Sequence, residues 1–91
     1  MGAGVTAERF RRRPGEIRAL RYTGENPDEV VEFGDGCVWH SGVPGSLAVE
    51  TLHGTVLAAP GDWIVLGPGG DYWPITDERF RATYEAVPNP S

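Results

Sequence analysis

The chain has 91 residues and a formal net charge of −5 at pH 7. This length allows one small domain and excludes two separate cores. Such a domain buries roughly 60–65% of its unfolded surface, so we expect subunit association to add stability. No stretch is long and apolar enough to predict a membrane span or a signal core. The sequence thus predicts a soluble, cytoplasmic, single-domain protein that forms homo-oligomers.

Amino-acid usage bears on origin more than on mechanism. Cys37 is the single cysteine, so no internal disulfide can form, which agrees with a reducing compartment and also with a disulfide-free secreted protein. All eight basic residues are arginine, glutamine is absent, and Gly, Ala, Val and Pro are abundant. GC-rich codons produce this bias, which indicates a high-GC bacterium or a phage that infects one.

Charge is divided unevenly along the chain. Residues 1–24 carry +4 and residues 25–91 carry −9. We interpret residues 1–15 as a basic, flexible arm that ends at a Pro-Gly break. Its clustered arginines are a candidate electrostatic contact for nucleic acid or an acidic partner: Arg9, Arg11, Arg12 and Arg13. Four arginines are few for DNA binding, and an acidic body repels phosphate, so nucleic-acid binding is the minor hypothesis.

Residues 16–87 are expected to form one α+β domain, which opens with a strand over residues 16–23. Its imperfect alternation places apolar side chains on both faces, so we expect both faces to be partly covered. A helix of about two turns follows over residues 26–34. Asn26 is the expected N-cap and Pro27 suits the first helical position, while Glu29 can complete a capping box. Gly34 is expected to end the helix in the left-handed conformation.

Residues 37–40 predict a short strand and raise the question of a metal site. Cys37, His40 and His53 are residue types that ligate zinc. Residues three apart in a strand point to opposite faces, however, and the sequence supplies no further Cys or His pair. We therefore expect no metal, with Cys37 buried and both histidines on the surface. A Cys–His nucleophile is disfavoured too, because no activating neighbour is visible.

Residues 46–60 predict a β-hairpin. With His53 and Gly54 as the loop residues, Thr51 is opposite Val56, and this face is the expected core side. Leu52 and Leu57 then lie on the other face. If they are exposed, they support a dimer contact, but a half-exposed sheet without a partner explains them about equally well.

A second hairpin and a final helix follow. Residues 63–66 and 71–75 are the expected strands. Because Pro74 lacks an N–H, the second strand should lie at a sheet edge or end there. Thr76 is the expected N-cap of the helix. An apolar stripe should dock this helix on the sheet: Phe80, Thr83, Tyr84 and Val87. Residues 88–91, together with Ala86 and Val87, are expected to form a frayed tail.

The segment over residues 60–75 is rich in Gly, Asp and Trp but does not predict catalysis. The Gly-Pro-Gly-Gly run at 67–70 resembles a phosphate cradle, yet Pro68 removes a donor and no helix begins there. Asp62 and Asp71 each border a turn, where aspartate serves the backbone. We therefore assign no catalytic, cofactor-binding or metal-binding residue, and the sequence leans away from an enzyme.

Exposed apolar and aromatic side chains are the remaining candidates for function. Tyr72 and Trp73 are adjacent in a strand, so one of them faces outward. The candidate interaction surface consists of Trp63, Tyr72, Trp73, Leu52 and Leu57. A candidate pocket for a nucleotide or metabolite lies between the sheet and the last helix and consists of Asp62, Trp63 and Tyr84.

Four sequence patterns carry a family resemblance over residues 16–85. They are Ala19-x-x-Tyr22-Thr23-Gly24-x-Asn26, then Thr51-Leu52-x-Gly54, and then Pro60-Gly61-Asp62-Trp63-Ile64-Val65-x-Gly67-x-x-Gly70-Asp71-x-x-Pro74 with Phe80-x-x-Thr83-Tyr84-Glu85. This set of patterns resembles a family of short phage and prophage proteins of uncharacterised function. Members usually place an acidic residue and an aromatic after the second glycine; here Asp71 and Tyr72 fill those places, while Trp73 stands directly before the proline. The resemblance implies origin and boundaries and transfers no active site.

The expected fold is α+β. It consists of a mainly antiparallel sheet of about five or six short strands, one helix after the first strand, and a C-terminal helix packed on the sheet. The leading functional hypothesis is a non-catalytic phage or prophage accessory protein that contacts a host or phage protein. The alternatives are a small-ligand binder or minor enzyme, and a nucleic-acid binder that uses the arginine arm.

Overall fold

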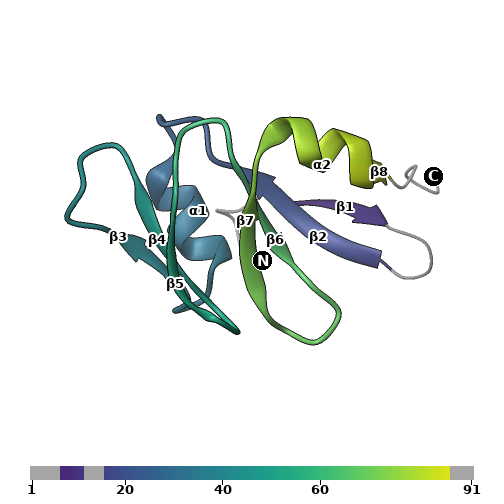
Figure 1. Ribbon diagram of the computed structural model, residues 1–91, viewed down its shortest axis with the longest axis horizontal. Coiled ribbons are helices and arrows are strands. Elements are labelled where there is room, and N and C mark those ends of the chain that lie inside the picture. Colours follow the sequence, from purple (N-terminus) through teal and green to yellow (C-terminus); the bar gives the residue numbers. More distant parts are fainter. Residues whose placement is uncertain (1–6, 12–15, 87–91) are drawn as a thin grey trace.

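The computed structural model describes residues 7–11 and 16–86. In chain order its elements are β1 (Glu8–Arg11), β2 (Glu16–Arg21), α1 (Pro27–Phe33), β3 (Val38–His40), β4 (Leu47–Thr51), β5 (Gly54–Ala58), β6 (Trp63–Leu66), β7 (Tyr72–Ile75), α2 (Asp77–Thr83) and β8 (Glu85–Ala86). The strands form a five-stranded sheet in the order β7-β6-β2-β1-β8 and a three-stranded sheet in the order β3-β4-β5 (Figure 1). All strand pairs are antiparallel.

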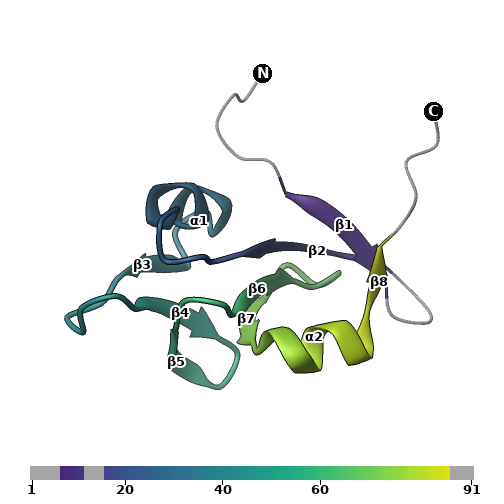
Figure 2. The same ribbon diagram turned by 90° about the horizontal axis from the view of Figure 1, so that it is seen from above.

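The two faces of the five-stranded sheet bury two separate apolar clusters. On one face, residues such as Leu20, Ile64 and Tyr72 pack against α1 and the three-stranded sheet. On the other face, Ala19 and Val65 pack with side chains of α2. The two helices accordingly lie on opposite sides of β2 (Figure 2). This arrangement confirms the expectation that the strand beginning at Glu16 is covered on both faces.

The α+β fold class, the helix after this strand and the C-terminal helix are confirmed. Two details differ from expectation. The strands divide between two sheets, and residues 8–11, expected in a flexible arm, pair with β2 from Glu8 opposite Ala19 to Arg11 opposite Glu16. Ala86, expected in a frayed tail, lies in β8 and pairs with β1. Residues 12–15 and 87–91 lie outside the described residues, and with them the predictions for Arg12, Arg13 and Val87.

Helix α1 occupies the predicted place, with Asn26 at the N-cap and Gly34 at the C-cap. The Asn26 side chain accepts no hydrogen bond from a helix N–H; its Oδ1 accepts from the Thr23 N–H at 2.8 Å, and its Nδ2 donates to Glu29 Oε1 at 3.1 Å. The left-handed stop expected at Gly34 is wrong, because Gly34 is helical with φ −72°. Gly34 is needed for space instead, since a Cβ there would overlap the Val38 side chain.

The first hairpin, β4–β5, forms with a register that differs from expectation. Thr51 pairs with Gly54 and Val49 pairs with Val56, so Leu52 and His53 are the loop residues. Gly54 has φ +114°, a value that side-chain-bearing residues rarely adopt, which explains why glycine closes this loop. The predicted loop of His53 and Gly54 is therefore wrong by one residue, because the loop lies one position earlier in the chain.

The second hairpin and α2 follow the sequence closely. Strands β6 and β7 have the predicted bounds within one residue, and β7 with Pro74 is an edge strand. The Thr76 side chain accepts from the Arg79 N–H at 3.3 Å and caps α2. Phe80 and Tyr84 are buried as predicted, but Thr83 is exposed and takes no part in the apolar stripe.

Candidate functional site

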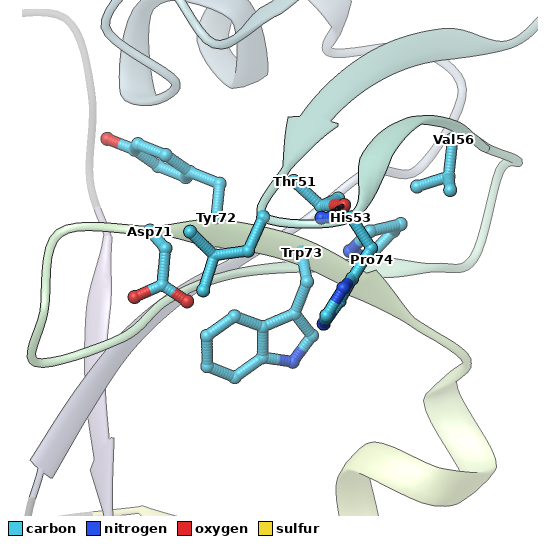
Figure 3. A pocket seen from close by; sticks show the side chains of 8 residues that line it. Thr51, His53, Val56, Asp71, Tyr72, Trp73 and Pro74 are labelled. Atoms are coloured by element: carbon cyan, nitrogen blue, oxygen red, sulfur yellow. Dashed lines mark hydrogen bonds between the residues drawn. The ribbon is translucent and has the colours of Figure 1, made fainter.

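A cleft of about 520 Å³ lies between the edge strand β7 and the tip of the β4–β5 hairpin (Figure 3). Its lining is mostly apolar and comes from two segments far apart in the sequence. The lining residues are Thr51, Leu52, His53, Val56, Asp71, Tyr72, Trp73 and Pro74. Apolar clefts with a few polar groups are the usual binding places of protein surfaces, so this cleft is the candidate functional site.

The glycine-rich turn before β7 positions two side chains at the cleft. A Cβ placed on Gly67 would lie 2.7 Å from the Trp73 ring and 3.5 Å from Asp71 Oδ1. The absence of a side chain at Gly67 thus lets the indole and the carboxylate approach each other over the turn. In Figure 3 the Asp71 carboxylate is directed toward the Trp73 ring.

The hairpin tip supplies the other wall of the cleft. Thr51 Oγ1 accepts from the His53 N–H at 3.1 Å and donates to the Gly54 carbonyl at 2.7 Å, which holds the loop in a compact turn. The turn leaves Leu52 77% exposed at its apex. Val56 follows on β5 and is 40% exposed beside the cleft.

A second cleft of about 370 Å³ shares Trp73 and Pro74 with the first. It continues along β7 to the start of α2 and is lined by Leu57, Asp62, Trp73, Pro74, Ile75, Thr76 and Arg79. Asp62 has a structural task here, because its Oδ2 accepts from the Ala59 N–H at 2.9 Å. Arg79 has no ion-pair partner within 4.0 Å among the residues that the structure describes.

Tyr72 and Trp73 do face opposite ways, and Trp73 is the accessible one. Tyr72 is buried, and its hydroxyl donates to the Phe33 carbonyl at 2.7 Å. Burial is the main cause that raises the pKa of the Tyr72 hydroxyl, and the nearby Asp35 and Cys37 raise it further. The hydroxyl therefore stays protonated and can donate. Tyr72 thus lies mostly in the core and reaches the expected interaction surface only where it lines the larger cleft.

Trp63 belongs to the packing of α2. Its ring stacks on Phe80 with centroids 4.0 Å apart, and Tyr84 contacts the same Phe80 ring at 5.1 Å. The Trp63 Nε1 donates to Asp77 Oδ1 at 2.8 Å, and this hydrogen bond, with the help of Arg81, lowers the pKa of the Asp77 carboxyl. Of the residues expected to form a pocket, Asp62 lines the smaller cleft, while Trp63 and Tyr84 pack with Phe80 of α2.

Of the residues predicted to be exposed, Leu52 and Leu57 are, at 77% and 51%. Trp39 was not predicted as a surface residue, yet it is 41% exposed and lies across β4 from Leu57, with Ala48 between them. Side chains alternate along a strand, so an inward Val38 would have predicted an outward Trp39. The side chains of Arg9 and Arg11 lie outside the described residues.

The candidate metal ligands lie apart. Cys37 is partly buried beside the main core, whereas His40 Nε2 is 3.7 Å from Asp28 Oδ1 and His53 lines the larger cleft. Among residues 7–11 and 16–86, no three His, Cys, Asp or Glu side chains are grouped so that they could hold a metal ion. Within the same part of the chain, no helix is long and apolar enough to cross a bilayer.

Comparisons with protein-family models, with curated proteins and with solved structures each found no match to this chain.

Proposed function

We propose that this protein is a non-catalytic accessory protein of phage or prophage origin, which acts by binding a host or phage protein. The observation that carries the proposal is the group of exposed apolar side chains beside the two clefts, namely Leu52, Val56 and Leu57. The proposed phage or prophage origin is supported by the Pro-Gly-Asp-Trp pattern of residues 60–63 and its continuation to Glu85.

Apolar side chains gathered at one end of a small acidic protein favour protein contact over solvation. Leu52 and Leu57 contribute little to the core, since each leaves half or more of its surface in water. Exposed apolar side chains that line clefts are typical of sites that bind another protein. The Asp62 and Asp77 carboxylates are engaged in the fold, Asp62 with a turn N–H and Asp77 with Trp63 and Arg81.

Affinity capture from lysates of the host bacterium, with matched variants, tests this function. Val56→Asp places a charge in the larger cleft, whereas Val43→Asp makes the same change at an exposed valine that lines neither cleft. We expect the wild type and Val43→Asp to retain one specific protein, identified by mass spectrometry, and Val56→Asp to lose it. Recovery of no specific protein, or equal recovery by Val56→Asp, would contradict the proposal.

A further inference from the structure

We propose that the two clefts along β7 together bind an extended peptide segment of the partner, with a basic side chain at one end and an acidic side chain at the other. This inference rests on the proposed function, because it names the part of the partner that the site recognises. The two clefts present the charges, donors and apolar walls that such a segment requires.

The basic end is assigned to Asp71 and Trp73. Both side chains lie within 3.5 Å of the same point above Gly67, and the Asp71 carboxylate has no hydrogen-bond or ion-pair partner among the described residues. A carboxylate beside an indole attracts an arginine or lysine head group through charge and through the ring face. The Trp73 indole N–H also lacks an acceptor among the described residues, so it is available to a peptide carbonyl.

The middle of the groove matches an extended chain. Trp73 and Pro74 belong to both clefts, and apolar side chains flank them from the hairpin. From Asp71 to Thr76 the strand advances about 17 Å at roughly 3.3 Å per residue, the span of five or six extended residues. Pro74 offers no N–H to a pairing strand, so side chains rather than a full backbone ladder should carry recognition.

The acidic end is assigned to Arg79 at the far side of the smaller cleft. Its guanidinium lacks an ion-pair partner among the described residues. The Asp62 carboxylate also lines this cleft and keeps its charge, but its hydrogen bond from the Ala59 N–H holds it at the turn before β6. Opposite charges at the two ends thus specify the direction of the segment. A phosphate-bearing ligand fits less well, because the carboxylate of Asp71 lines the larger cleft and no Lys or Arg does.

A displayed library of random heptapeptides, selected on the wild-type protein, provides the test. Enriched peptides should carry Arg or Lys at one end, apolar residues in the middle and Asp or Glu at the other end. Synthetic copies are then titrated while the three indole N–H signals are followed by NMR. We expect the Trp73 signal to shift and the Trp39 signal to stay in place.

Charge variants assign the two ends. Asp71→Asn should weaken binding about three- to tenfold, and replacing the basic residue of the peptide by Gln should have no further effect in that variant. Arg79→Gln should behave in the same way toward the acidic residue. Asp28→Asn makes the same charge change as Asp71→Asn at an exposed position of α1 and should leave binding unchanged. Circular dichroism checks that each variant is folded.

Lack of enrichment, enrichment without a basic residue, or equal binding to Asp71→Asn would overturn the inference. These results are separable from a failure of the proposed function. If capture of a partner protein depends on Val56 but not on Asp71 or Arg79, the proposed function is supported and the inference of a charged peptide segment is refuted. Peptide binding without any captured protein would support the recognition chemistry and refute the proposed role.

Discussion

Replacing Tyr72 by Phe tests the contact that joins the edge of the large sheet to the end of α1. The Phe33 carbonyl is among the last of the helix, where no intrahelical N–H is available. The Tyr72 hydroxyl fills this gap at 2.7 Å in a buried position, and the two rings pack edge to face with centroids 5.6 Å apart. Phenylalanine keeps the ring contact and removes only the hydroxyl.

We expect this substitution to lower the free energy of unfolding by about 1–2 kcal/mol. A typical hydrogen bond contributes about 1 kcal/mol, and a buried carbonyl left without a partner adds to the loss. For a domain of this size, each kcal/mol lowers Tm by about 4–8 °C. The matched control is Tyr22→Phe, which removes a 3.0 Å bond from a part-buried hydroxyl to the Gly45 carbonyl, where water can replace the lost donor.

Thermal and urea unfolding followed by circular dichroism measure both variants. The pKa of Tyr72 is raised in the folded state, so the stability due to its protonated hydroxyl is fully present below about pH 10 and is lost as the pH rises through the folded pKa. The difference in Tm between wild type and Tyr72→Phe should therefore shrink above pH 10. A loss no larger than that of Tyr22→Phe at pH 7, or a difference that grows with pH, would refute this reasoning.

Three further predictions concern packing, ionisation and the exposed surface. Gly34→Ala should destabilise by about 1–3 kcal/mol in urea unfolding, because its methyl group meets the Val38 side chain, and Val38→Ala should cost less in the Gly34→Ala background than in the wild type. Trp63→Phe should raise the pKa of Asp77, measured by carboxyl NMR, and an unchanged pKa would contradict the assigned hydrogen bond. Because the pKa of Asp77 is lowered in the folded state, the stability that Asp77 contributes is present above about pH 4 and is lost as the pH falls. Leu52→Ser at the exposed hairpin tip should change stability by less than about 0.5 kcal/mol, and a Tm loss of several degrees would show that Leu52 packs in the fold.

Local signals in the chain were sufficient for most elements of secondary structure. The cap at Thr76, the proline at the start of α1 and the proline in β7 act through backbone geometry within a few residues, and each lies where it was expected. The hairpin at residues 47–58 was also evident, but its register was not. Loop residues are set by the positive φ of Gly54 and by pairing across the whole hairpin, and the alternation of side chains alone allowed a shift of one residue.

The sequence by itself determined that Tyr72 and Trp73 point to opposite faces of one strand, because side chains alternate along an extended backbone. Only the tertiary structure decided which of them is buried. The α1 carbonyl that receives the Tyr72 hydroxyl lies 39 residues away, and the cleft at Trp73 exists because the β4–β5 hairpin approaches the open edge of β7. Such contacts depend on how two sheets and a helix pack together, which no local pattern encodes.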